Sequence, residues 1–75
     1  MKIYGYTKHN EKELQEMEEI SFLASSEQLT AVANFLLKYA DIMKKNKDFE
    51  HAHLQDEYKD WKDTFPDVII IGQGK

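Results

Sequence analysis

Hydrophobic residues recur at helical spacing between Ser25 and about Lys45. Residues three, four and seven positions apart share one face of an α-helix, so this pattern predicts a single long amphipathic helix. We expect that face to pack on a β-sheet. Its members are Leu29, Val32, Ala33, Leu36, Ala40 and Met43. The apolar residues that widen it on either side are Phe35, Tyr39, Ile42 and Leu37.

The widened face covers an arc of about 220°, which is more than one small sheet can bury. We therefore expect the rest of the chain, or another chain, to cover the helix. The ends of the helix are also marked. Ser25 and Gln28 form the S-x-x-Q pattern of a capping box, and Lys44 and Lys45 suit the negative end of the helix dipole. Asn46 is the residue expected just past the helix end.

Two strands are predicted before the helix. Residues 2–6 are rich in aromatic and β-branched types, and a polar loop follows over 7–12. Apolar and polar residues then alternate toward Ala24, which predicts a second strand over 16–24. We expect Ile20, Phe22 and Ala24 to face the core from that strand.

The segment after the helix is less regular. Residues 51–55 could form a short strand and residues 56–63 a short helical turn, and Pro66 precedes an apolar strand over 68–71. That strand carries no polar alternation, so we expect cover on both of its faces, from the protein itself or at a subunit interface. A homodimer would supply this cover.

The resulting fold class is α+β, with one long helix packed on a small mixed β-sheet in the order β-β-α-β. The crossover through the helix should be right-handed if the second and last strands are parallel. The length of 75 residues fits one domain over 1–75, and we expect residues 72–75 to form a flexible tail.

The composition of the chain argues against several classes of function. The net charge is −4, and all ten basic residues are Lys, so the chain lacks the Arg side chains that bind phosphate and guanine in a bidentate manner. We therefore expect no nucleic-acid partner. There is no Cys for a disulfide or a thiolate metal site, no membrane-spanning apolar run and no signal-peptide pattern at the N-terminus. These features predict a cytoplasmic protein without a membrane association.

One cluster has the composition of a metal site. In His51-x-His53-x-x-Asp56, two imidazoles on a strand would share a face, with the carboxylate as a third ligand. The alternative is a pair of histidines that bond to neighbouring carboxylates. Short motifs of this kind usually arise by chance, and no nucleophile, base and orienting group stand out elsewhere. We expect no bound metal, no cofactor and no enzyme activity.

Two further features have more than one interpretation. Carboxylates crowd the first hairpin, either as a solvated face or as a docking surface for a basic partner. Trp61 is the only Trp in the chain, and it could fill the flank of the helix or anchor an interface.

Several stretches of the chain together fit the sequence pattern of a known family. The most specific stretch is Asp48-Phe49-x-His51-x-His53-Leu54-x-Asp56, followed by Trp61 and by Pro66-Asp67 before an aliphatic strand. The other stretches are Tyr4-Gly5-Tyr6, Ile20-Ser21-Phe22-Leu23-Ala24-Ser25 and Ala33-x-Phe35-Leu36-Leu37. On these residues, the chain resembles the immunity protein 32 family of bacterial polymorphic toxin systems from Ile3 to Ile71. The resemblance implies a small α+β protein that binds the effector domain of a toxin and protects the producing cell.

Charge and resemblance together suggest a mechanism without catalysis. Carboxylates would occupy a basic cleft of the cognate toxin domain, while buried side chains hold the complex. The residues that we expect to contact this partner are Glu16, Glu18, Glu19, Asp48, His51, His53, Asp56, Asp60 and Trp61. The alternative function is a small metal- or ligand-dependent regulatory protein that uses His51, His53 and Asp56.

Overall fold

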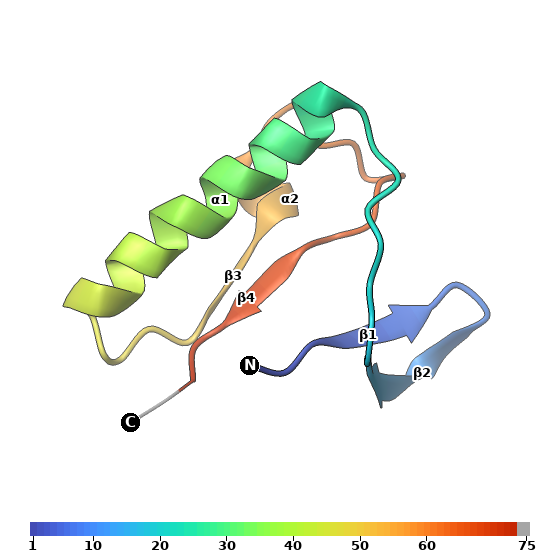
Figure 1. Cartoon of the computed structure of the whole chain (residues 1–75), viewed down its shortest axis with the longest axis horizontal. Helices are drawn as coiled ribbons and strands as arrows, with labels where there is room; N and C mark the ends of the chain where they lie inside the picture. Colours follow the sequence, from blue (N-terminus) through green and yellow to red (C-terminus); the bar gives the residue numbers. More distant parts are fainter. Residues whose placement is uncertain (74–75) are drawn as a thin grey trace.

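The computed structural model describes residues 1–73 and confirms the α+β class. A long helix lies over a two-stranded sheet, and a separate hairpin lies to one side of them (Figure 1). The elements are β1 (Tyr4–Thr7), β2 (Asn10–Glu16), α1 (Ser26–Lys45), β3 (His51–His53), α2 (Leu54–Glu57) and β4 (Ile69–Ile71).

The ends of α1 follow from its sequence. The Ser25 hydroxyl accepts a hydrogen bond from the Gln28 N–H at 3.1 Å, and the Gln28 side chain accepts one from the Ser25 N–H at 2.9 Å. This is the predicted capping box, and it satisfies two N–H groups that the helix itself leaves unbonded. Asn46 is the C-cap in extended conformation, and its N–H donates to the Ile42 carbonyl at 2.8 Å.

The first hairpin forms, but the predicted second strand over 16–24 is wrong. β2 begins at Asn10, directly after a tight turn, and pairs antiparallel with β1 until Tyr4 lies opposite Glu16. One more hydrogen bond, from the Met17 N–H to the Ile3 carbonyl, ends the pairing. Because Tyr4 is the first residue of β1, the residues after this point, 18–24, have no neighbouring strand to pair with. Leu14 is the only apolar residue of β2, and residues 11–16 are exposed on both faces of the strand, so β2 shows no hydrophobic alternation.

The single mixed sheet with a right-handed crossover is also wrong. β3 and β4 form their own antiparallel sheet, in which His51 lies opposite Ile71, Ala52 opposite Ile70 and His53 opposite Ile69. The chain turns back on itself between these two strands, and this reversal makes them antiparallel neighbours. The sequence pattern instead predicts that the last strand joins the first hairpin in one sheet.

The helix presents a different face to the sheet from the one expected. Its buried residues are Ala31, Val32, Phe35 and Tyr39, whereas Leu36 is 44% exposed and Leu29 48% exposed. The aromatic side chains decide this rotation, because the Tyr39 ring packs against Phe35 at 5.1 Å and Phe49 at 5.4 Å between centroids. The wide apolar arc is therefore buried on its aromatic side and open on its Leu29–Leu36 side.

The core lies between α1 and the β3–β4 sheet. Its most buried side chain is Leu54, with 1% exposure, and the buried Ala52 lies two residues earlier, in β3. Phe49, Ile42, Trp61, Val68 and Ile70 pack around these residues. Among the described residues, none of positions 1–24 belongs to this core. We call residues 1–24 the N-terminal arm.

The molecule is extended for its mass. It exposes 6882 Å² of surface, whereas a compact monomer of 8.9 kDa exposes about 4,800 Å². The radius of gyration is 13.1 Å, compared with about 11 Å for a compact domain of this length. The arm accounts for part of this excess, because Ile20 and Phe22 are exposed and do not face a core as expected.

The last strand is only partly covered. Ile70 packs on the core, while Ile69 and Ile71 on the other face are 47% and 68% exposed. The predicted flexible tail does not begin at Gly72, because the N–H of Gly72 donates a hydrogen bond to the Glu50 carbonyl at 2.7 Å. Residues 74–75 of the predicted tail lie outside the described residues. A homodimer remains a prediction.

Candidate functional site

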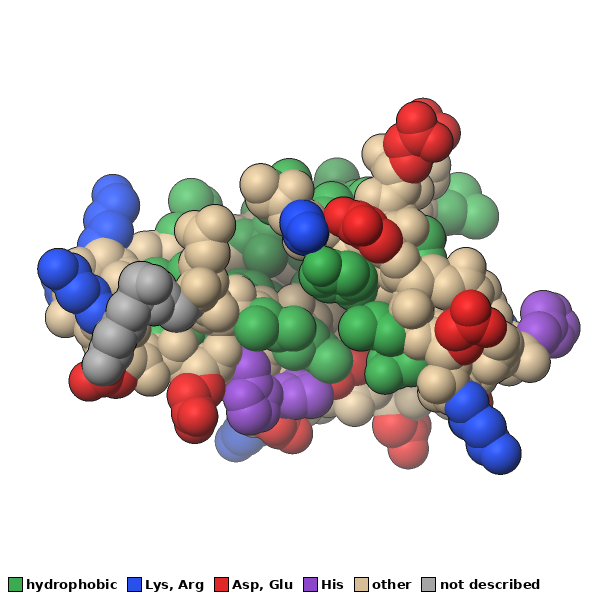
Figure 2. Space-filling model, turned by 90° about the horizontal axis from the view of Figure 1, so that it is seen from below, with side chains coloured by type: hydrophobic (Ala, Val, Ile, Leu, Met, Phe, Trp, Pro, Cys, Tyr) green, Lys and Arg blue, Asp and Glu red, His purple; other side chains and the backbone are tan. Residues whose placement is uncertain are grey.

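The face of the β3–β4 sheet that points away from α1 carries two of the predicted site residues. Side chains at alternate strand positions share a face, and Ala52 and Ile70 take the core side. His51 and His53 therefore lie on the outer face, directly opposite Ile71 and Ile69. Figure 2 shows this side of the molecule, with histidine side chains beside hydrophobic ones.

A carboxylate that the sequence analysis did not select holds one of these histidines. Asp67 Oδ2 lies 2.6 Å from His53 Nδ1, and Asp67 Oδ1 accepts a hydrogen bond from the Gln55 N–H at 3.2 Å. Both groups are partly buried, with side-chain exposures of 35% for His53 and 22% for Asp67. The signal in the sequence was a carboxylate placed directly before the apolar strand. Its contact with His53 follows only from the way β3 and β4 pair.

The His51 ring lies beside His53, with 5.3 Å between the ring centroids and an angle of 78° between the planes. Asp56 does not join them, because it lies on the exposed surface of α2. Within residues 1–73, no three His, Asp or Glu side chains are grouped so that they could hold a metal ion. The candidate three-ligand set of His51, His53 and Asp56 is therefore not formed among the described residues.

Trp61 lies against the core, as the first of its two interpretations expects. It is partly buried, its indole N–H donates to the Pro66 carbonyl at 2.9 Å, and its ring lies 5.2 Å from that of Phe65. These contacts fix the loop between α2 and β4. These contacts support the first interpretation, and the role of Trp61 as an interface anchor stays a prediction.

The predicted acidic residues lie in separate places. Glu16 ends β2, and Glu18 and Glu19 follow in the exposed part of the arm. Asp60 is exposed after α2, and Asp48 follows the end of α1, where its N–H donates to the Asn46 side chain at 3.0 Å. Figure 2 shows carboxylates spread over the face that it presents instead of gathered in one patch. Among the predicted contact residues, Glu16, Glu18 and Glu19 are kept together by their proximity in the sequence.

A second carboxylate, that of Glu57, is engaged in contacts within the protein. Glu57 accepts hydrogen bonds from Lys38 Nζ at 2.7 Å and from the Tyr39 hydroxyl. The hydrogen bond from Lys38, followed by that from Tyr39, lowers the pKa of Glu57 below its ordinary value. The same contact with Glu57 raises the pKa of both Lys38 and Tyr39. This cluster joins α2 to α1 and leaves Glu57 little capacity for a partner.

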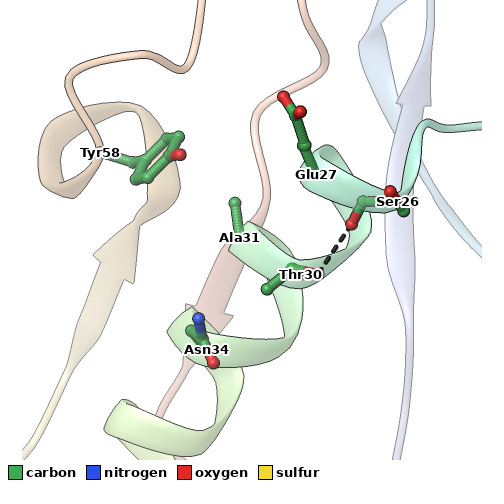
Figure 3. A pocket seen from close by; sticks show the side chains of 6 residues that line it. All are labelled: Ser26, Glu27, Thr30, Ala31, Asn34 and Tyr58. Atoms are coloured by element: carbon green, nitrogen blue, oxygen red, sulfur yellow. Dashed lines mark hydrogen bonds between the residues drawn. The ribbon is translucent and has the colours of Figure 1, made fainter.

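A shallow pocket lies beside the first turns of α1 (Figure 3). It is lined by Ser26, Glu27, Thr30, Ala31, Asn34 and Tyr58. The Thr30 hydroxyl donates to the Ser26 carbonyl at 2.7 Å, so it is engaged within the helix. The titratable groups in this lining are the Glu27 carboxylate and the Tyr58 hydroxyl.

Sequence reasoning missed one exposed apolar segment. Residues 20–23 leave the hairpin and lead to α1, and Ile20, Phe22 and Leu23 are 44%, 54% and 104% exposed. They follow Glu16, Glu18 and Glu19 in the chain. The alternation that suggested a buried strand is here a run of apolar side chains open to a partner.

None of the described helices is both long enough and apolar enough to cross a bilayer. Comparison of the chain with protein-family models, with curated proteins and with solved structures found no match.

Proposed function

We propose that this protein is an immunity protein that binds the effector domain of a cognate bacterial toxin and neutralises it without catalysis. The observation that carries this proposal is the exposed segment of residues 16–23, in which three glutamates precede three large apolar side chains. Apolar residues beside charged ones match the usual composition of a protein interface, with a hydrophobic centre and a polar rim.

The surface area of the molecule supports a protein partner. The chain exposes about 2,000 Å² more than a compact monomer of its mass, and a standard interface buries about 800 Å² on each partner. The N-terminal arm could therefore be covered entirely by a partner without disturbing the core. Because the arm contributes nothing to that core, its residues are free to be selected for binding.

The charge of the arm favours a basic partner. Glu16, Glu18 and Glu19 are all exposed, so they would meet a cationic surface without first breaking contacts within the fold. Carboxylates placed over a basic cleft speed the encounter and exclude the anionic substrate of the toxin. We expect Phe22 and Leu23, whose side chains are more exposed than that of Trp61, to be the main anchors of the complex.

A co-expression assay tests this proposal. Cells that produce the toxin domain encoded beside this gene should survive when the unaltered protein is co-expressed. The double variant Phe22→Asp with Leu23→Asp should lose protection while keeping the circular dichroism of the parent. Leu37→Asp is the matched control, because Leu37 is also exposed but lies on α1, and it should protect fully. Full protection by the arm variant would refute the proposed binding surface.

The alternative regulatory function receives no comparable support. It required His51, His53 and Asp56 to act together, and the described residues do not group them.

A further inference from the structure

We propose that His51 and His53 form a binding site for one divalent transition-metal ion of the type that imidazole prefers, such as Zn²⁺, Ni²⁺ or Cu²⁺. The site lies on the outer face of the β3–β4 sheet. This inference is independent of the proposed toxin binding, and it revises the sequence-based expectation of no metal. The two rings supply the protein ligands, and water completes the coordination.

The separation of the two rings fits a shared ion. Their centroids lie 5.3 Å apart on one face of the sheet. Two imidazoles that bind a tetrahedral ion, each through a nitrogen at about 2 Å, have centroids about 5 Å apart. The two rings therefore already have the required spacing, and only the His51 ring needs to turn.

Asp67 completes the arrangement as a positioning residue. Its contact of 2.6 Å with Nδ1 of His53 fixes that ring and leaves Nε2 available. Histidines that bind metals commonly donate their other N–H to a carboxylate in this way, which orients the ring and makes it a better ligand. Asp67 is itself held by the Gln55 N–H at 3.2 Å, so the carboxylate is in place before any ion binds.

His51 is able to turn toward the same ion. Its side chain is exposed, and within the described part of the chain it makes no hydrogen bond that a metal would have to break. Ile69 and Ile71 lie across the strands from the two histidines and place no competing charge beside them. Nitrogen ligands without a thiolate favour Zn²⁺, Ni²⁺ or Cu²⁺ over Mg²⁺ and Ca²⁺, which prefer oxygen.

Titration of the tag-free full chain with Zn²⁺ tests the site, using calorimetry together with the NMR signals of the imidazole rings. We expect one ion per chain, with shifts of the His51 and His53 ring signals. His51→Ala and His53→Ala should each weaken binding at least tenfold. His9→Ala is the matched control, because His9 is the third His of the chain and lies in the first hairpin, and it should change nothing.

The variant Asp67→Asn tests whether the carboxylate of Asp67 contributes to metal binding through His53. The amide can still accept the hydrogen bond from Gln55 but carries no charge, so we expect binding to weaken by about 10- to 100-fold. Zn²⁺ binding that is unaffected by His51→Ala and His53→Ala, or that is lost in His9→Ala, would overturn the proposed site. So would the absence of heat and ring shifts up to millimolar Zn²⁺. Unchanged affinity in Asp67→Asn would overturn the role of Asp67.

Discussion

The hydroxyl of Tyr39 donates a hydrogen bond to the carboxylate of Glu57 and thereby joins the middle of α1 to the end of α2. Lys38 binds the other oxygen of the same carboxylate at 2.7 Å. Neighbouring residues of the helix thus hold one acidic side chain from both sides. Because Tyr39 is also part of the core, this contact connects the charged surface to the packing beneath it.

The first prediction concerns how the stability of the protein changes at acidic pH. The pKa of Glu57 in the folded protein is lowered from its ordinary value of 4.5, chiefly by the hydrogen bond from Lys38. A lowered pKa contributes stability that is complete above the ordinary value and is lost as the pH falls through the folded value. We therefore expect Glu57→Gln to reduce stability at pH 7 but to differ less from the parent as the pH falls below about 4.5. Urea unfolding at several pH values measures this.

Asp41→Asn is the control for that experiment. Asp41 pairs with Lys45 at 3.1 Å on the surface of α1, where both side chains are largely exposed. Such surface pairs contribute little, so this variant should follow the parent at every pH. Equal behaviour of Glu57→Gln and Asp41→Asn would show that Glu57 has no special coupling to the core.

The second prediction compares the centre of the core, at Leu54 of α2, with the side of α1 that carries Leu36. Leu54→Ala should lower the free energy of unfolding by about 2–5 kcal/mol, because this side chain is almost completely enclosed. Leu36→Ala should cost well under half as much, because Leu36 is already 44% exposed. Chemical denaturation of both variants provides the comparison. A larger loss for Leu36→Ala would restore the helix face that the periodicity alone indicated.

The third prediction concerns the end of the β3–β4 sheet. A Cβ atom at Gly72 would overlap the carbonyl oxygen of Phe49, which belongs to the main chain and cannot rotate away as a side chain can. We expect Gly72→Ala to destabilise the protein by about 1–3 kcal/mol and to expose the Gly72 amide to hydrogen exchange. At Gly5 the nearest atom is the flexible end of Met17 at 3.3 Å, so Gly5→Ala should be tolerated. Similar losses in both variants would contradict this packing.

The fourth prediction concerns association with the toxin domain. Replacing Glu16, Glu18 and Glu19 with Lys should slow association and flatten its dependence on salt, because the attraction to a basic cleft is removed. Phe22→Ala should instead mainly speed dissociation. Surface plasmon resonance at several salt concentrations separates the two effects. An association rate that responds to neither salt nor charge reversal would leave the electrostatic part of the mechanism without support.

The sequence by itself determined much of the local structure of this protein. The capping box at Ser25 and Gln28, the length of α1 and the strands predicted over 2–6, 51–55 and 68–71 depend on neighbours in the chain and were visible in the pattern. The bounds of the short helix were not, because it lies at Leu54–Glu57 instead of 56–63. The His51–His53 pair was visible for the same reason, because alternate strand positions share a face.

Only the tertiary structure decided how these elements meet. The apolar arc of α1 was wide enough to offer several faces, and the packing of Tyr39 with Phe35 and Phe49 selected one of them. The partner of His53 proved to be Asp67, fourteen residues away, and not the nearby Asp56. The short β1 ended its pairing at Glu16, which left residues 18–24 exposed instead of buried. Periodicity records which residues can be buried, whereas the choice among them depends on contacts between segments that are distant in the sequence.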